Sequence, residues 1–317
     1  MIENKKISLV IPAYNEEKMI AEVITSTPHF VDKIIVVDDN SNDATATITT
    51  ELQQSDDRIT LLRHQTNGGV GAAIISGYKY SKENNFDITA VVAGDGQMDP
   101  KELIKLCEPL VYESVDYAKG NRLVHEDAWK AMPRYRFIGN SILSLLTKIS
   151  SGYWFLTDTQ TGYTAISLHA LKSLNLDTIY KNYGFPNDIL VKLNVINAKI
   201  KEIPIKPIYY KDGKSGIRLH KVIPKISYLL FKNFFWRMKE KYVIRDFHPL
   251  VFFYFLSFFL FIIDIGLIIR LLVILFDTGR LAPMNMLSII FVSITGLQFL
   301  LFAMWFDMDY NRHLKIE

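Results

Sequence analysis

Two stretches near the amino terminus, ISLVIPAYNEE at residues 7–17 and KIIVVDDNSND at residues 33–43, decide the fold. Each begins as a short apolar run typical of a buried strand and ends abruptly in polar residues. Similar apolar runs occur at residues 59–62 and 88–92, and helix-like patterns occur around residues 16–26, 43–54, 71–81 and 100–114. This alternation predicts an α/β domain with a parallel sheet. Ligands bind such sheets beyond the carboxyl ends of the strands, so we expect the chemistry in the residues that follow each strand.

The third apolar run is followed by a glycine-rich loop, Asn67-Gly68-Gly69-Val70-Gly71. Glycines let backbone amides approach a ligand, and the start of the helix that follows favours an anion. The spacing does not match the dinucleotide-binding pattern, and no Walker lysine motif is present. Glycines also build plain turns, so both interpretations of this loop stay open.

The fourth run leads into Gly94-Asp95-Gly96-Gln97-Met98-Asp99-Pro100. On an extended segment Asp95 and Gln97, two positions apart, point to the same side. Oxygen ligands of this kind hold Mg²⁺ or Mn²⁺ and leave coordination positions for substrate phosphates. An aspartate beside glycines is also common in a plain turn, and Asp99 is equally suited to capping the next helix.

Near residue 247 the composition changes from mixed patterning to long apolar runs at residues 249–276 and 284–306. Each run exceeds the roughly 20 residues that cross a hydrocarbon layer of about 30 Å. We therefore predict two transmembrane helices joined by a tight turn, rather than two buried core helices, which normally keep a polar face. Asp264 in the first run is costly in lipid, which indicates a functional group or a contact with a neighbouring subunit in a homo-oligomer.

Basic residues gather directly before the first apolar run, against the single acid Glu240: Arg218, Lys221, Lys225, Lys232, Arg237, Lys239, Lys241 and Arg245. Positive charge beside a span predicts that the large domain and both termini are cytoplasmic. Aromatic residues interleave with these charges, which indicates amphipathic helices in the headgroup layer of the bilayer, with a solvated charged face as the alternative. We therefore predict four parts: a large α/β domain at residues 1–216, a basic amphipathic juxtamembrane segment at 217–246, two transmembrane helices at 247–306 and a cytoplasmic tail at 307–317.

Charge, cysteine content and the length of the first apolar run argue against several classes of protein. A formal net charge of +3, with the basic residues clustered beside the apolar runs, does not fit nucleic-acid binding. Cys107 is the only cysteine, so no intramolecular disulfide forms. The first apolar run is too short for the core of a signal peptide.

Together these segments resemble the family 2 glycosyltransferases of the dolichol-phosphate mannose synthase type, which include bacterial polyprenyl-phosphate glycosyltransferases. The resemblance covers essentially the whole chain. It rests on residues 12–17, 37–39, 67–71 and 95–100, on Gly120-Asn121-Arg122, on residues 158–163 and on the two predicted spans. It implies a Rossmann-like GT-A domain that binds a nucleotide sugar, followed by juxtamembrane amphipathic helices and a transmembrane hairpin.

The resemblance also implies roles for individual residues. The donor site would be formed by Pro12, Tyr14, Glu16, Val37, Asp39, Gly71 and Gly94. Asp95 and Gln97 would hold Mg²⁺ or Mn²⁺ on the donor diphosphate, and Arg122 would meet phosphate charge. Asp158 occupies the place of a catalytic carboxylate, with a helix cap or buried hydrogen-bond partner as the alternative, and Asp188 is a further candidate for a sugar contact.

Basic residues elsewhere are candidates for phosphate binding. Lys214 and Arg218 lie in the late basic motif and suit donor or acceptor phosphate, or equally the surface near lipid. Arg134 and Arg136 fall in a region that resembles the acceptor loop of the family. One departure concerns the acidic triplet, which usually begins with an aspartate where this chain has Ala93.

The reaction implied is transfer of a sugar from GDP-mannose or a UDP-sugar to a polyprenyl phosphate, dolichyl or undecaprenyl. A phosphate monoester is largely ionised at neutral pH because its second pKa is about 6, so we expect direct displacement with inversion and no obligatory base. Asp158 then orients hydroxyl groups as readily as it takes a proton. The alternatives are a glycosyltransferase with another membrane acceptor and, because of Ala93, a catalytically weak lipid-binding component.

Overall fold

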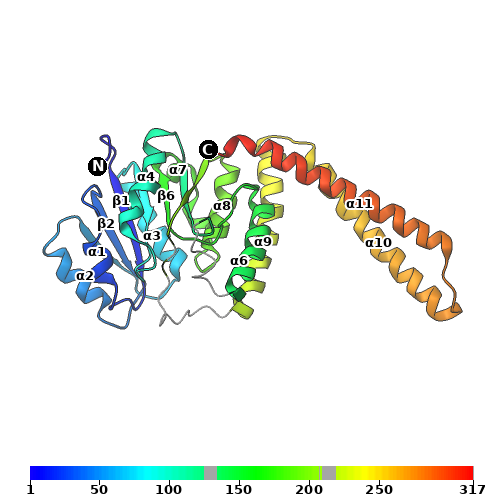
Figure 1. The fold of residues 1–317 in the computed structure, drawn as a ribbon, viewed down its shortest axis with the longest axis horizontal. Helices are drawn as coiled ribbons and strands as arrows, with labels where there is room; N and C mark the ends of the chain where they lie inside the picture. The colour runs from blue at the N-terminus through cyan, green and yellow to red at the C-terminus, as the bar shows by residue number, and fades with distance from the viewer. Residues whose placement is uncertain (125–133, 207, 209–218, 317) are drawn as a thin grey trace. The chain divides into compact units, whose positions relative to one another are not determined.

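The computed structural model describes the chain except for residues 125–133, 207, 209–218 and 317, and for the side chains of residues 134–138 and 219–222 (Figure 1). The chain forms two compact units. One unit comprises Met1–Phe234 together with His313–Glu317, and the other comprises Phe235–Arg312. The first unit is built on a sheet and the second on a pair of long helices.

The described strands of the first unit form one seven-stranded sheet with the order β3-β2-β1-β4-β6-β5-β7. The four strands predicted from the sequence are parallel, and their bounds are β1 (Ile7–Ala13), β2 (Lys33–Asp38), β3 (Ile59–Arg63) and β4 (Ile88–Val91). The sequence did not predict β5 (Tyr117–Asn121), β6 (Thr164–Ser167) and β7 (Ile200–Pro204). Strand β6 runs antiparallel to both of its neighbours, so the complete sheet is mixed.

Helices cover both faces of the sheet (Figure 1). One face packs against α3 (Val70–Glu83), α7 (Leu168–Ser173) and α8 (Phe185–Val195), and the other against α1 (Ile20–Thr25), α2 (Thr45–Gln53) and α4 (Leu103–Tyr112). In β1, Val10 belongs to the first core, whereas Leu9 and Ile11 belong to the second. Burial on both faces explains why the parallel strands read as continuous apolar runs.

Two further helices, α6 (Arg134–Ser151) and α9 (Leu219–Lys239), pack together through Leu143, Ile226 and Leu230. The carboxyl-terminal residues also belong to the first unit. Leu314 is 1% exposed within the core, and the amide of Ile316 donates to the carbonyl of Ile200 on β7 at 3.2 Å. In the segment that we expected to form a tail, residues 307–310 therefore continue the last helix, and Leu314 and Ile316 pack on the core and the sheet.

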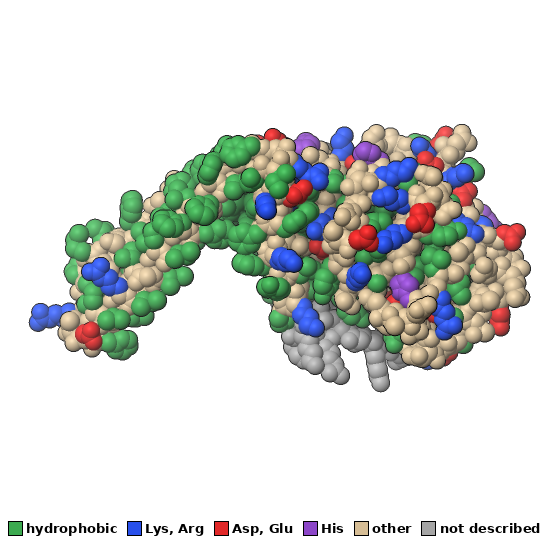
Figure 2. All heavy atoms as spheres, turned by 180° about the vertical axis from the view of Figure 1, so that it is seen from behind, with side chains coloured by type: hydrophobic (Ala, Val, Ile, Leu, Met, Phe, Trp, Pro, Cys, Tyr) green, Lys and Arg blue, Asp and Glu red, His purple; other side chains and the backbone are tan. Residues whose placement is uncertain are grey.

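The second unit contains α10 (Leu250–Thr278) and α11 (Pro283–Tyr310), which are long and apolar enough to cross a membrane. Gly279 ends α10 in the left-handed region, with φ of 63°, and Pro283 begins α11, as the turn signals predict. Figure 2 shows hydrophobic side chains over most of the visible face of this hairpin. Phe255 is 72% exposed and Phe276 85% exposed, which suits contact with lipid rather than water.

Polar side chains between the two helices bond to each other or to backbone. Ser293 donates to the Asp264 carboxylate at 2.6 Å, and Asn285 donates to the carbonyl of Leu267 at 2.9 Å. Asp264 is therefore 8% exposed and bonded within its own hairpin. Oδ1 of Asp264 has no hydrogen-bond partner among the described residues, and a contact with a neighbouring subunit stays a prediction.

Two of the basic residues expected to face headgroups are buried instead. Arg237 is fully buried and pairs with Asp307 through two contacts of 2.8 and 2.9 Å. Lys241, in a π-helical segment at Glu240–Arg245, is 2% exposed and donates to Asn311 at 2.8 Å. A buried guanidinium requires a carboxylate partner, and Asp307 lies 70 residues away in the sequence, so charge counting did not reveal this pair.

Candidate active site

The ends of β1, β2 and β4 bring several predicted residues to one edge of the sheet. Pro12 lies opposite Val37 in the register of β1 and β2. The amide of Asp39 donates to the carbonyl of Ala13 at 2.9 Å, and the amide of Gly94 donates to the carbonyl of Pro12 at 3.2 Å. The strand exits that the sequence indicated separately are therefore neighbours.

Asp39 joins the end of β2 to the glycine-rich loop. Its carboxylate accepts hydrogen bonds from the amides of Gly68 at 2.9 Å and Gly69 at 2.7 Å, and it contacts Nδ1 of His64 at 2.6 Å. The other ring nitrogen of His64 lies 2.8 Å from Oγ of Ser76 on α3. Asp39 is thus a structural centre of this edge, with a side chain only 4% exposed.

Close packing accounts for the glycines of this loop. Gly69 has a φ of 91°, and a Cβ added to Gly71 would lie 2.6 Å from the carbonyl oxygen of Tyr180. The amides of Gly68 and Gly69 already donate to Asp39. The plain structural interpretation of this loop is therefore sufficient, and a donor contact at Gly71 stays a prediction.

Hydrogen bonds tie the loop after β1 to the loop after β2. The amide of Asn15 donates to Ser41 at 2.9 Å, and the amide of Glu16 donates to Thr45 at 2.8 Å. This arrangement leaves the Tyr14 side chain 45% exposed at the edge of the sheet. An exposed aromatic ring on a fixed loop is suited to contact with a flat ligand group.

Glu16 and Asp95 concentrate negative charge beside these loops. Burial, together with the nearby carboxylates of Asp95 and Asp43, raises the pKa of Glu16 to about 7. Burial also raises the pKa of Asp95, whose Oδ1 accepts a hydrogen bond from the amide of Gln97 at 3.0 Å. Carboxylates whose ionisation is opposed in this way favour a bound cation.

The donor set fits a divalent cation that is shared with a phosphate. Asp95 and Gln97 supply oxygen ligands of the kind that Mg²⁺ and Mn²⁺ take. Within the part of the chain that the structure describes, no group of three or more His, Cys, Asp or Glu side chains could enclose a metal. Ions of this kind keep several coordination positions for ligand phosphates and water.

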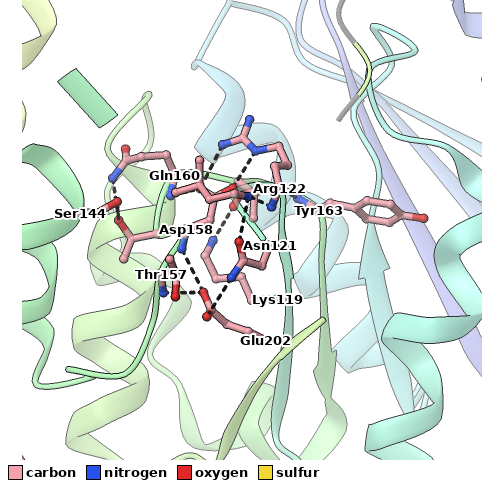
Figure 3. Close-up of polar contacts among 12 residues, drawn as sticks. Lys119, Asn121, Arg122, Ser144, Thr157, Asp158, Gln160, Tyr163 and Glu202 are labelled. Atoms are coloured by element: carbon pink, nitrogen blue, oxygen red, sulfur yellow. Dashed lines mark hydrogen bonds and ion pairs between the residues drawn. The ribbon is translucent and has the colours of Figure 1, made fainter. Parts of the chain in front are cut away.

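Arg122 and Asp158 form an ion pair beyond the end of β5 (Figure 3). Nε of Arg122 lies 2.7 Å from Oδ2 of Asp158, and Nη2 lies 3.1 Å from Oδ1. The backbone amides of Arg122 and Gln160 also donate to this carboxylate, each at 3.2 Å. Burial opposes ionisation of Asp158, but the charge and hydrogen bonds of Arg122 hold its pKa below the usual value. Asp158 is therefore an ionised, weakly basic carboxylate.

Three residues around this pair were missed by the sequence analysis (Figure 3). Glu202 on β7 accepts hydrogen bonds from the amides of Thr157 and Asp158 and from Asn121. Lys119 is fully buried, donates to the carbonyl of Thr161 at 2.5 Å, and has its pKa lowered to about 8, mainly by burial. Asn121 lies inside the sequence motif that supplied Arg122. Glu202 follows Lys201 in a short charged segment that was not predicted as a strand, so no sequence signal indicated it.

Asp188 is 2% exposed, and both of its oxygens are engaged, by the amide of Tyr180 at 2.8 Å and by Asn233 at 2.6 Å. These bonds give it a packing role, and a sugar contact stays a prediction. Lys214 and Arg218 lie outside the described residues. Arg134 and Arg136 lie in the first turn of α6, and their side chains are outside the described part.

The chain is similar in sequence to known glycosyltransferases. Residues 8–174 match the model of the family described as glycosyl transferase family 2. The chain is 36% identical over 219 residues to the UDP-N-acetylglucosamine–dolichyl-phosphate N-acetylglucosaminyltransferase of Methanococcus voltae, a match covering 65% of this chain and 87% of that protein. It is 28% identical over 213 residues to the undecaprenyl-phosphate mannosyltransferase of Micrococcus luteus, covering 66% and 86% of the two chains.

Among solved structures, glucosyl-3-phosphoglycerate synthase from Mycobacterium tuberculosis, in complex with Mn²⁺, UDP and glucosyl-3-phosphoglycerate, has a similar fold. The TM-score is 0.55 at 19% identity, and the match covers 74% of this chain and 80% of that chain. This similarity confirms the predicted GT-A fold.

Proposed function

Because the chain belongs to glycosyl transferase family 2, we propose that it transfers a sugar from a nucleotide-sugar donor to the phosphate of a polyprenyl lipid. The observation that carries the acceptor class is the 36% identity to the Methanococcus voltae relative, whose name specifies a dolichyl-phosphate acceptor. Two helices apolar enough to cross a membrane support an acceptor that resides in lipid.

The ion pair of Arg122 and Asp158 fits a reaction without an obligatory base. In this reaction an oxygen of the lipid phosphate attacks the anomeric carbon, and the bond from that carbon to the donor diphosphate breaks with its electron pair on the diphosphate. The nucleophile is already anionic at neutral pH, since the second pKa of a phosphate monoester is about 6. An Asp158 whose pKa is lowered has little tendency to take a proton, so it acts by orienting Arg122 and substrate groups.

Asp95 and Gln97 would hold Mg²⁺ or Mn²⁺, which supplies positive charge for the departing diphosphate when it is bound. Pro12, Val37 and Tyr14 lie at the edge of the sheet where a nucleoside would bind. Direct displacement on the anomeric carbon gives inversion of its configuration. Metal dependence and inversion are thus both part of the proposal.

The two spanning helices would keep the first unit at the membrane surface. A hairpin returns both of its ends to one side of the bilayer, and the basic residues before α10 favour the cytoplasmic side. The lipid phosphate lies at that same surface, so the helices need contribute no chemistry of their own.

The donor is best sought first among UDP-sugars. The relative with 36% identity is named for UDP-N-acetylglucosamine, whereas the mannosyltransferase relative is 28% identical. The experiment offers radiolabelled UDP-N-acetylglucosamine, UDP-glucose and GDP-mannose with dolichyl or undecaprenyl phosphate, in detergent with Mg²⁺ or Mn²⁺. Diacylglycerol serves as the competing acceptor. Label in the polyprenyl lipid supports the proposal, and label only in diacylglycerol contradicts it.

A further inference from the structure

The carboxylate of Glu202 accepts hydrogen bonds from the two chain segments that carry Arg122 and Asp158 (Figure 3). Its Oε1 accepts hydrogen bonds from the amide of Thr157 at 2.7 Å and from the amide of Asp158 at 3.0 Å. Its Oε2 accepts a hydrogen bond from Nδ2 of Asn121, the neighbour of Arg122, at 3.1 Å. One side chain on β7 thus joins the end of β5 to the loop that carries Asp158.

We propose that Glu202 is a positioning residue for sugar transfer, which sets the Asp158 carboxylate against the Arg122 guanidinium. This inference rests on the proposed function. Residues 155–163 lie in neither a helix nor a strand, so regular backbone pairing does not fix the position of Asp158. The two amide hydrogen bonds to Glu202 supply that constraint.

A second hydrogen bond fixes which end of the Asn121 side-chain amide faces Glu202. Oδ1 of Asn121 accepts a hydrogen bond from the amide of Leu123 at 2.9 Å, which directs its Nδ2 group toward Glu202. Asn121 is 2% exposed, so its amide group is held by these partners rather than by bulk water. The backbone on both sides of Arg122 is consequently tied to the same carboxylate that holds Asp158.

The negative charge of Glu202 also balances positive charge near the ion pair. The register of β5 and β7 places Glu202 beside Lys119, which is fully buried. Lys119 and Arg122 are therefore matched by Asp158 and Glu202, two charges of each sign. Loss of the Glu202 charge leaves two cations to compete for Asp158, and this competition weakens the fixed geometry of the pair.

The experiment uses the full-length protein in detergent, with the donor that the label-transfer panel identifies and undecaprenyl phosphate as acceptor. Glu202→Ala removes all three hydrogen bonds, and we expect kcat to fall about 100-fold, as a displacement of about 1 Å in a reacting group does. Affinity for the nucleoside diphosphate, measured by calorimetry, should stay within about twofold, because three strands, β5, β6 and β4, separate Glu202 on β7 from the ends of β1 and β2. A role in folding alone would not divide kcat from nucleotide affinity in this way.

Exchanging the donor and acceptor roles of residues 121 and 202 tests the hydrogen bond between Asn121 and Glu202 directly. Glu202→Gln keeps the acceptor for Thr157 and Asp158 but sets an NH₂ group against Nδ2 of Asn121, so we expect an intermediate loss of kcat. Asn121→Asp combined with Glu202→Gln restores one donor and one acceptor with the roles reversed. The double variant should recover kcat to within about fivefold of the wild type, since coupled partners are not additive.

Glu113→Gln is the matched control. Glu113 pairs with Lys201, the residue before Glu202 on β7, at 2.5 Å, and is 39% exposed. Successive strand residues point to opposite faces, so this pair lies away from Asp158, and kcat should be unchanged.

The possible outcomes distinguish failure of the positioning role from failure of the proposed sugar transfer. If the wild type is active and Glu202→Ala has the same kcat, the positioning role is wrong while the proposed function stands. The positioning role is also wrong if the kcat of the double variant is no higher than that of Glu202→Gln. If Glu202→Ala fails to fold, the comparison of Glu202→Gln with the double variant decides. A wild type that binds nucleotide but labels no polyprenyl phosphate overturns the proposed function and the positioning role together.

Discussion

The Arg122 guanidinium and the Asp158 carboxylate hold each other through two contacts, with Nε 2.7 Å from Oδ2 and Nη2 3.1 Å from Oδ1. Both residues were candidates from the sequence, but as separate groups, one for phosphate and one for catalysis. Their pairing changes the chemistry expected of each. Asp158 is an ionised orienting group, and Arg122 is held in place before any phosphate arrives.

The pH dependence of transfer should therefore reflect the acceptor and not Asp158. Since the pKa of Asp158 is lowered, this carboxylate is ionised throughout pH 5–9. We expect kcat/KM to rise with pH through about 6, where the lipid phosphate loses its second proton. Asp158→Asn should lower kcat about 100-fold or more while leaving the midpoint of this rise unchanged. A midpoint that disappears in Asp158→Asn would instead identify Asp158 as the base.

Metal affinity should increase between pH 6 and pH 8. The pKa of Glu16 is about 7, so over this interval Glu16 changes from mostly neutral to mostly ionised, adding a negative charge near Asp95. Mn²⁺ binding in the presence of nucleotide, measured by calorimetry, should tighten several-fold as pH rises. Glu16→Gln should flatten this dependence, while Glu22→Gln, on the exposed side of α1, should retain it. Equal slopes in wild type and Glu16→Gln would contradict the assignment.

Asp39→Ala should destabilise the first unit. The substitution leaves the amides of Gly68 and Gly69 and the imidazole of His64 without their carboxylate partner. These donors are only partly buried, so each loss should cost less than the roughly 1–3 kcal/mol of a fully buried unsatisfied donor, but the three losses together should still lower the thermal midpoint clearly. Asp177→Ala removes the exposed pair with Lys79 and should have little effect. Similar midpoints for the two variants would show that Asp39 does not support the loop.

Asp307→Ala should destabilise the second unit, because it leaves the fully buried Arg237 guanidinium without its carboxylate. Removing one partner of a buried pair costs about 3–5 kcal/mol. Replacing both partners, as Arg237→Met with Asp307→Leu, should cost less than the single change. Thermal unfolding in detergent measures the difference, with Glu240→Gln at the surface pair with Arg245 as the control. A double variant less stable than Asp307→Ala would contradict this account.

The sequence predicted the features that depend on local pattern. The strands β1 to β4 contain continuous apolar runs, and α10 and α11 are recognised as candidate membrane spans by their length and apolar composition. Features that depend on distant contacts were not predicted. Strand β5 contains Lys119 and Asn121, which are buried and donate hydrogen bonds to Thr161 and Glu202, residues far away in the sequence.

The same limit applies to the candidate site. Asp39 and Gly71 were predicted as separate contacts to the donor, and the structure shows that Asp39 bonds to the amides of Gly68 and Gly69 and that Gly71 packs against Tyr180. Their contacts with the donor stay predictions. Arg237 and Lys241 were counted as headgroup charges, although the partners that bury them, Asp307 and Asn311, lie 70 residues away. Residue type indicated the chemistry of these positions, and only the fold decided which groups meet.

The most direct test of sugar transfer to polyprenyl phosphate is identification of both products by mass spectrometry after reaction of the full-length protein with a nucleotide sugar and undecaprenyl phosphate. The account predicts a lipid with one phosphate bearing one sugar, together with a nucleoside diphosphate. A lipid with two phosphates and a nucleoside monophosphate would mean that a sugar phosphate was transferred. That result, or no modified lipid with any donor, would contradict the proposed displacement at the anomeric carbon.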